Sequence, residues 1–401
     1  MVVGGMAAFS LLVLCAVIPL AIAALVFFVE ILAAIFSRKD EDHFRGKRPP
    51  IVVLIPAHNE GRGILPTLTD IKSQIRESDR LVVIADNCTD DTAQIAKAAG
   101  AWVIERVDPD RLGKGYALEF GLRSLQATDP EIVIFIDADC RLGESLIDNL
   151  AQTCSSSGRP VQALYLMSAP EQVGLNYSIS EFAWRIRNDL RPRGLWALGL
   201  PCQLMGSGMA FKRAHLSRIK VATGHLTEDL DLGLQLAAVG HAALFCPSAV
   251  VRSVFPTTEA ASIAQRQRWA HGHLSIIGRK VLPSFWMALR DRNWALLTLS
   301  LDAAIPPLVL FVLLSLLVFC AGGGVWLLGA GAAPMIVAVM TLCLVGSGLC
   351  FAWIICGRDL LTLRSLFSLI PYVTSKVKIY SRVFDPNKKW VRTRRAESDQ
   401  L

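Results

Sequence analysis

The sequence predicts an α/β domain built on a mostly parallel sheet, with transmembrane α-helices at both of its ends. Two long uncharged runs occupy the ends of the chain, and short apolar runs alternate with helical patterns between them. Hydrophobic residues make up 53% of the 401 residues and charged residues only 19%, which is apolar for a soluble enzyme. The apolar excess lies in the two end runs, so the middle of the chain reads as an ordinary α/β protein.

The N-terminal run predicts a membrane anchor over residues 1–37. Residues 1–29 carry no charged side chain, and a spanning helix needs only roughly 20 apolar residues. A signal peptide is the alternative, but such a peptide has a positively charged start and a shorter apolar core. The start here, Met1-Val2-Val3, is neutral, which favours an anchor.

The second uncharged run, residues 303–357, is long enough for two further spans. We expect these spans near 305–328 and 334–356, within a membrane segment at 301–357. Helices at the membrane interface are expected near 274–300. Apolar and basic residues mix over 360–384, which is typical of an amphipathic interfacial segment. Residues 358–401 are therefore expected to form this segment and a basic cytoplasmic tail.

Basic residues flank the predicted spans on one side of the membrane. They follow the first span and the third, whereas the stretch between the second and third spans has no charge. The positive-inside rule then predicts an integral inner-membrane protein with its middle domain and C-terminus in the cytoplasm. Attraction to anionic lipids accounts for the net charge of +7, so nucleic acid is not an expected partner. The ten cysteines form no C-x-x-C pair, and no disulfide is expected.

The middle region predicts strands at 51–56, 81–85, 101–105 and 132–136. Helices are expected at 64–75, from the Thr-Asp-Asp-Thr sequence at 89–92, and at 118–125. Ligands of open α/β sheets bind beyond the carboxyl ends of the strands. That rule predicts one site at which the following polar residues meet: His58, Asn59, Glu60, Asp86, Asp137 and Asp139.

Asp137-Ala138-Asp139 places two carboxylates at positions i and i+2 directly after an apolar strand. Such a pair in a turn can face one cation, and carboxylates suit hard Mg²⁺ or Mn²⁺ ions that also bind phosphates. Asp is common wherever a strand ends in a turn, so the pattern alone is a weak indication.

Two further motifs have both a structural and a functional interpretation. Thr227-Glu228-Asp229 is either a helix cap followed by acids that interact favourably with the helix dipole, or it provides a general base, Asp229. The sequence Gln-Arg-Gln-Arg-Trp at 265–269 is either an aromatic and basic interface anchor or a diphosphate site. Both interpretations stay open on the residues alone.

Taken together, these motifs resemble glycosyltransferase family 2, in particular its membrane-bound branch with cellulose, chitin and hyaluronan synthases. The resemblance covers most of the chain, since it extends from the anchor through Ala57, Asp86 and the later motifs to the C-terminal spans. It implies a GT-A-type nucleotide-sugar-binding domain, which we expect at residues 38–300.

The resemblance also implies roles for single residues. The uridine would be held by Ala57, Glu60 and Asp86, with Lys114 against the nucleotide. Asp137 would contact the nucleotide, and Asp139 would hold Mg²⁺ or Mn²⁺. The catalytic pair would be Asp229, as base, and Glu228. The remaining implied residues line the diphosphate and acceptor side: Gln265, Arg268, Trp269, Gly206, Ser207 and Gly208.

The expected reaction is an inverting, metal-dependent transfer from a UDP-sugar to a hydroxyl of a lipid-linked or growing exopolysaccharide glycan. Single glycosylation of a membrane lipid, as in ceramide glucosyltransferase-like enzymes, is an alternative. A processive synthase subunit and a catalytically inactive scaffold are others. Only two spans follow the middle domain, which disfavours a polymer channel. Membrane lipids, polysaccharide-export proteins and a second copy of the chain are the other expected partners.

Overall fold

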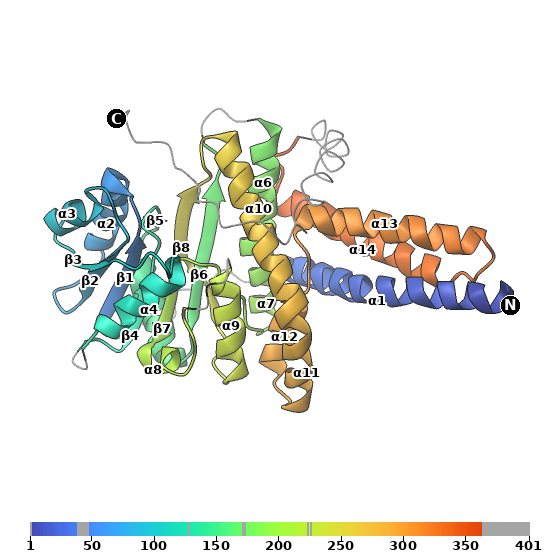
Figure 1. The fold of residues 1–401 in the computed structure, drawn as a ribbon, viewed down its shortest axis with the longest axis horizontal. Helices are drawn as coiled ribbons and strands as arrows, with labels where there is room; N and C mark the ends of the chain where they lie inside the picture. The colour runs from blue at the N-terminus through green and yellow to red at the C-terminus, as the bar shows by residue number, and fades with distance from the viewer. Residues whose placement is uncertain are drawn as a thin grey trace.

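The computed structural model describes residues 2–37, 48–126, 129–170, 174–222, 224 and 227–362. The α/β domain lies on one side of the molecule, and a bundle of three long helices extends from it on the other (Figure 1). The segment expected at 360–384 and the basic tail lie almost wholly outside the described residues.

One eight-stranded sheet forms the centre of the described α/β domain, with the strand order β3-β2-β1-β4-β7-β6-β8-β5. Neighbours are parallel from β3 to β4 and between β6 and β8, which confirms the expected α/β class. The strands are β1 (Ile51–Ala57), β2 (Arg80–Asp86), β3 (Trp102–Arg106), β4 (Ile132–Phe135), β5 (Arg141–Leu142), β6 (Val161–Ser168), β7 (Met209–Lys212) and β8 (Leu244–Val254).

The antiparallel pairing of β4 with β7 decides where the site forms. Phe135 is the partner of Met209, so the end of β4 lies beside the start of β7. The residues that follow β4 and those that precede β7 therefore share one edge of the sheet. This is also the edge at which the parallel strands β1 and β2 end.

Helices cover the sheet and bury its apolar strands. Residues of β1 and β4 are almost completely inaccessible to water, as expected for strands of a parallel sheet with both faces covered. The helices between strands include η1 (Gly61–Ile64), α2 (Leu65–Lys72), α3 (Thr92–Ala98), α4 (Lys114–Ser124), α5 (Leu146–Ser157), α8 (Arg213–Leu216) and α9 (Glu228–Ala238).

Several helix boundaries differ from the expected ones. The helix expected at 64–75 is a short 3₁₀ turn followed by α2, and it ends at Lys72. The helix expected from Thr89 begins at Thr92. The helix expected at 118–125 begins earlier, at Lys114, because Gly113 adopts a φ of 126° that lets the chain turn sharply into α4.

Three helices are long and apolar enough to cross a membrane, and they occur where the uncharged runs predicted them. They are α1 (Val2–Ile35), α13 (Leu308–Leu327) and α14 (Ala333–Cys356). Helix α13 begins three residues later than expected, because Pro306 and Pro307 immediately precede its first turn.

A second group of helices lies between the sheet and the bundle (Figure 1). It consists of α6 (Leu175–Arg185), a π-helical turn η2 (Ile186–Leu190), α7 (Arg191–Ala197), α10 (Glu259–Ile276), a π-helical turn η3 (Ile277–Val281), α11 (Leu282–Arg290) and α12 (Trp294–Ala303). Leu282 and Trp286 on α11 are each 61% exposed. The position of these helices at a membrane interface, like the division into domains, stays a prediction.

A buried ion-pair triad joins the bundle to the α/β domain. Arg191 on α7 donates from Nε to a carboxylate oxygen of Glu30 on α1 at 2.7 Å, and it also pairs with Asp302 on α12. Next to this triad, Gly194 allows α7 to touch the α1 backbone. A Cβ atom at Gly194 would lie 1.9 Å from the Glu30 carbonyl oxygen.

We expect Gly194→Ala to destabilise the protein, because the added methyl group would force α7 away from α1. Overpacking of this kind costs about 1–3 kcal/mol. Thermal unfolding in detergent should show a lower midpoint for this variant. Gly346→Ala on α14 is the control, since a Cβ there would meet no atom within 4 Å. Equal midpoints for the two variants would contradict the close contact.

Candidate active site

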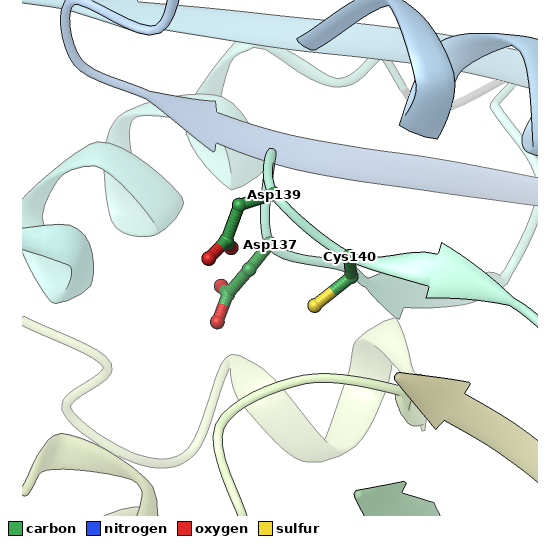
Figure 2. A group of neighbouring side chains, drawn as sticks. All are labelled: Asp137, Asp139 and Cys140. Atoms are coloured by element: carbon green, nitrogen blue, oxygen red, sulfur yellow. The ribbon is translucent and has the colours of Figure 1, made fainter. Parts of the chain in front are cut away.

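The acidic pair after β4 faces one space. Asp137, Asp139 and Cys140 each place one possible ligand atom so that all three atoms lie within 4.8 Å of one another. Figure 2 shows the two carboxylates side by side on the turn that follows β4. The backbone N–H of Asp137 donates to the Ser207 hydroxyl at 3.0 Å, which ties this turn to the segment before β7.

Lys114, the first residue of α4, is the cation at the centre of the site. Its ammonium group pairs with the Asp137 carboxylate and donates to the Gly206 carbonyl oxygen at 2.6 Å. The negative charges of Asp137, Glu228 and Asp229 raise the pKa of Lys114 although burial opposes them, so Lys114 stays charged. Three segments that are distant in the sequence thus meet at one ammonium group.

Glu228 and Asp229 occupy the first turn of α9, where the helix dipole favours acids. Burial raises the pKa of Glu228 to about 7, against the lowering effect of Lys114. Burial also raises the pKa of Asp229, and the positive charge of Arg187 opposes this. Thr227 holds the N-cap position, as the capping interpretation of this motif requires, but its buried hydroxyl bonds no partner in the described chain, so it provides no side-chain cap.

The segment Gly206-Ser207-Gly208 adopts a backbone that requires glycine at both of its ends. Gly206 and Gly208 have φ angles of 96° and 67°. A Cβ at Gly208 would lie 2.6 Å from the Cβ of Ala163, so the close packing also excludes a side chain. The buried Gln162 side chain donates to the Ser207 carbonyl at 2.9 Å and accepts from the Met205 N–H at 2.8 Å, which fixes the segment.

The donor set at the acidic turn fits a hard divalent cation. Two carboxylates on one turn suit Mg²⁺ or Mn²⁺. Burial raises the pKa of the Cys140 thiol well above its usual value, so this group stays protonated beside the Ser207 hydroxyl and is a poor ligand. Both Asp137 and Asp139 are candidate ligands, and Asp137 also pairs with Lys114.

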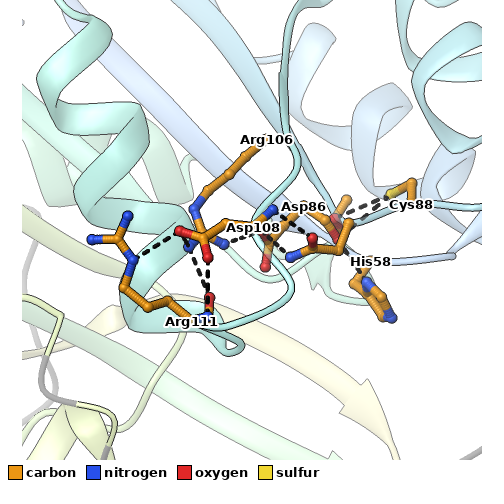
Figure 3. Close-up of polar contacts among 8 residues, drawn as sticks. His58, Asp86, Cys88, Arg106, Asp108 and Arg111 are labelled. Carbon is orange, nitrogen blue, oxygen red and sulfur yellow. Dashed lines mark hydrogen bonds and ion pairs between the residues drawn. The ribbon is translucent and has the colours of Figure 1, made fainter.

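A second polar cluster lies at the carboxyl ends of β2 and β3 (Figure 3). Arg106 pairs with Asp86 Oδ1 at 2.5 Å, and the His58 ring lies 2.6 Å from the Asp86 carbonyl oxygen. Burial raises the pKa of Asp86, against the lowering effect of Arg106. Within the described residues, Arg106 and Asn87 donate hydrogen bonds to this carboxylate, and both bonds are to Oδ1.

Ala57 and Glu60 lie close to this cluster. Ala57 ends β1 and is 2% exposed, while the Glu60 N–H donates to the Thr92 hydroxyl at 2.9 Å. Arg106 lies over the ring of Tyr116 on α4, 5.8 Å from its centroid. Helix α4, which begins at Lys114, therefore connects the Asp86 cluster with the acidic turn.

The Gln-Arg-Gln-Arg-Trp residues lie on α10, which runs between the sheet and the helix bundle (Figure 1). Trp269 packs against Trp184 of α6 with ring centroids 4.9 Å apart. Gln265 is buried, and its side-chain oxygen has no hydrogen-bond partner in the described chain. Trp269 lines a cavity between α6, α10 and α1, so the structure places this residue beside the bundle.

The structure adds two arginines that the sequence patterns did not select. Arg106 ends β3, and the rule that placed Asp86 at the sheet edge also applies to it. Arg187 lies in the π-helical turn η2, and its positive charge reaches Asp229. No periodicity or motif of the sequence indicated Arg187, because π-helical turns have no sequence signature of that kind.

Comparison with known proteins places the chain among glycosyl-transferring enzymes. Residues 49–272 match the family model described as "Glycosyltransferase like family 2". The curated "Probable glycosyltransferase YdaM" of Bacillus subtilis (strain 168) is 25% identical over 259 residues, which are 61% of this chain and 60% of that protein. Glucosyl-3-phosphoglycerate synthase of Mycobacterium tuberculosis is 41% identical over 95 residues, 22% of this chain and 28% of that one. The matches thus span less than two thirds of either relative.

Two solved structures show a more distant likeness. The mannosyltransferase of Pyrobaculum calidifontis in complex with GDP-Man and Mn²⁺ is 19% identical, with a TM-score of 0.48 over 84% of this chain and 99% of that one. The mycobacterial synthase in complex with Mn²⁺, UDP and phosphoglyceric acid is 24% identical, with a TM-score of 0.39 over 55% of this chain and 76% of that one.

Proposed function

Because the chain belongs to glycosyltransferase-like family 2, we propose that it moves a sugar from a UDP-sugar to a hydroxyl group of a lipid-linked or growing exopolysaccharide acceptor. The observation that carries this proposal is the convergence on Lys114 of the acidic turn, the glycine segment and the first turn of α9. A leaving diphosphate needs a cation nearby, and an acceptor hydroxyl needs a general base. Lys114 and the acids around it would supply both at one site.

The reaction is a single inverting displacement. The acceptor hydroxyl loses its proton to the Asp229 carboxylate as its oxygen bonds to the anomeric carbon, and the bond from that carbon to the UDP oxygen breaks on the opposite face. Burial raises the pKa of Asp229, which brings this base closer to neutral pH than an exposed aspartate. Glu228 is the neighbouring residue, and the positive charge of Lys114 acts on its carboxylate as well.

The departing diphosphate is stabilised by positive charge fixed in advance. Lys114 is held between Asp137 and the Gly206 carbonyl, so its ammonium group needs no reorganisation during the reaction. Arg268 on α10 adds a second cation on the acceptor side. A Mg²⁺ or Mn²⁺ ion held by Asp139 would supply further charge neutralisation at the diphosphate oxygens.

The nucleotide base binds at the Asp86 cluster. Arg106 and Asn87 fix Asp86 Oδ1, which leaves Oδ2 as the acceptor for a uracil N–H group. Ala57 and Glu60 form the neighbouring wall after β1, and Lys114 at the start of α4 faces the phosphates. Gly206, Ser207 and Gly208 line the donor-sugar side, where the absence of large side chains lets a sugar approach the backbone.

The alternative acceptor, a single membrane lipid, is favoured by one observation. The cavity beside Trp269 is bounded by Phe27 of α1 and Leu308 of α13, two of the helices that can span a membrane. A processive synthase is less well supported, because the three candidate spans of the described chain can hardly enclose a path for a polysaccharide. The synthase branch of the family therefore stays a prediction.

We expect Asp229→Asn to lower turnover about a thousandfold while UDP affinity changes little, because the base acts on the acceptor and not on the nucleotide. UDP release measures turnover, and calorimetry measures UDP binding. Asp291→Asn, at an exposed aspartate beyond α11, is the matched control and should be fully active. A loss of UDP affinity as large as the loss of turnover would refute the assignment of the base.

Activity should require Mg²⁺ or Mn²⁺, and Asp139→Asn should weaken Mn²⁺ binding more than tenfold, because this carboxylate is the proposed ligand. Electron paramagnetic resonance of free Mn²⁺ measures the binding, and added chelator tests the requirement. Asp110→Asn, on an exposed loop, provides the control. Undiminished transfer in excess chelator would show that the acidic turn does not act through a metal.

The α/β domain should face the cytoplasm, as the basic residues beside the spans indicate. A cysteine replacing Ala332, between α13 and α14, should then react with an impermeant thiol reagent from outside the cell. A cysteine replacing the exposed Glu77 should react only after lysis. The unaltered chain measures labelling of the natural cysteines. The reverse labelling pattern would overturn this orientation.

A further inference from the structure

The cavity beside Trp269 lies outside the Lys114 centre, and both the α/β domain and the helix bundle contribute to its wall. Its volume is about 190 Å³, which is room for about six water-sized groups. Phe27 of α1 and Ile305, Pro307 and Leu308 before and at the start of α13 form the side facing the bundle. Trp184 and Trp269 form the side facing the α/β domain.

The charge of the cavity wall is entirely positive. The lining residues include Arg187, Arg191 and Arg266, and none of the described lining residues is an acid. Arg191 is neutralised by Glu30 and Asp302. Arg266 donates to the Ser180 hydroxyl at 2.6 Å, a neutral partner that leaves its charge uncompensated.

Of the three arginines in the cavity wall, Arg187 is the one whose positive charge is least compensated by polar or acidic partners. Within the described residues no hydrogen bond or ion pair reaches its guanidinium group, although Arg187 lines both this cavity and a smaller one next to it. Burying such a charge without an anion is costly. The Asp229 carboxylate forms no hydrogen bond or ion pair with Arg187 in the described structure and affects it only through its charge.

The cavity is lined by residues beside the proposed base and by residues beside the candidate membrane spans. Arg187 lines both this cavity and the smaller one, whose wall includes Leu230, the residue next to Asp229. Pro307, Leu308 and Val309 line the cavity at the start of α13, a helix that can span a membrane. A molecule that contacts both groups of residues has a polar, anionic end toward the proposed base and an apolar end toward the bilayer.

We propose that the acceptor is an anionic lipid, whose phosphate-bearing headgroup binds Arg187 and Arg266 and whose hydrocarbon chain passes Phe27 and Leu308 into the bilayer. That this lipid is the acceptor rests on the proposed function. The binding of an anionic lipid in this cavity does not. The headgroup hydroxyl would then lie on the side of the cavity from which Asp229 acts.

The test measures lipid binding by the full-length chain without any sugar donor. The purified protein, after delipidation in detergent, is titrated with phosphatidylglycerol or with phosphatidylcholine, and bound lipid is counted by native mass spectrometry. The wild type should retain phosphatidylglycerol at least tenfold more tightly. Arg187→Gln should remove this preference. Arg193→Gln should keep it, because Arg193 pairs with Asp189 and does not line the cavity.

A second variant separates the hydrocarbon site from the charge. Ala183 lines the cavity on α6, so Ala183→Trp should fill it and lower the binding of both lipids. Glycerol 3-phosphate, a water-soluble phosphate, should compete only weakly. Equal binding of the two lipids by the wild type, an unchanged preference in Arg187→Gln, or full competition by glycerol 3-phosphate would each overturn the proposal.

The outcomes distinguish this proposal from the proposed function. Binding of phosphatidylglycerol that depends on Arg187, without sugar transfer from any UDP-sugar, would leave the lipid site standing and refute the activity. Sugar transfer to a lipid whose binding does not depend on Arg187 would support the activity and refute the lipid site. Monodisperse gel-filtration profiles of Arg187→Gln and Arg193→Gln would confirm that both variants are folded.

Discussion

The buried contact of Arg191 with Glu30 and Asp302 is the constraint on which the arrangement of the molecule depends. Removing three charges from water is costly, and the cost is offset only while all three partners stay in place. The partners come from α7, α1 and α12, so the contact fixes the first span and the helices before α13 relative to one another. Loss of one partner would leave a buried charge unpaired, at a cost of about 3–5 kcal/mol.

A second constraint is the direction of β7. Because β7 runs antiparallel to β4, the glycine segment before β7 and the acidic turn after β4 meet at one edge of the sheet. The Asp137 N–H bonds Ser207 across this meeting point, and Lys114 closes it from α4. The fold thus assembles the site from residues that no single short motif contains, and the Gln162 side chain fixes the glycine segment through its hydrogen bonds to Ser207 and Met205.

The sequence predicted the sheet edge and the three apolar helices well, because buried strands and spanning helices have strong hydrophobic patterns. It also indicated Asp86, Asp137 and Asp139, since each follows a strand. It could not place Arg187, because the position of that residue depends on a π-helical turn and on tertiary packing. For the same reason the start of α4 was misplaced: the unusual backbone angle of Gly113 is not visible in a hydrophobic pattern.

The turn η2 has a consequence for the evolution of such enzymes. A π-helical turn holds one residue more than the α-helix around it, so insertion or deletion of one residue there would rotate α7 relative to α6 by roughly 100°. Trp184 precedes the turn and Arg191 follows it. A single-codon change could therefore redirect α7, the helix that packs against α1, while the carboxylates at the sheet edge stay in place, and variation at this turn offers a short route to altered packing beside the cavity.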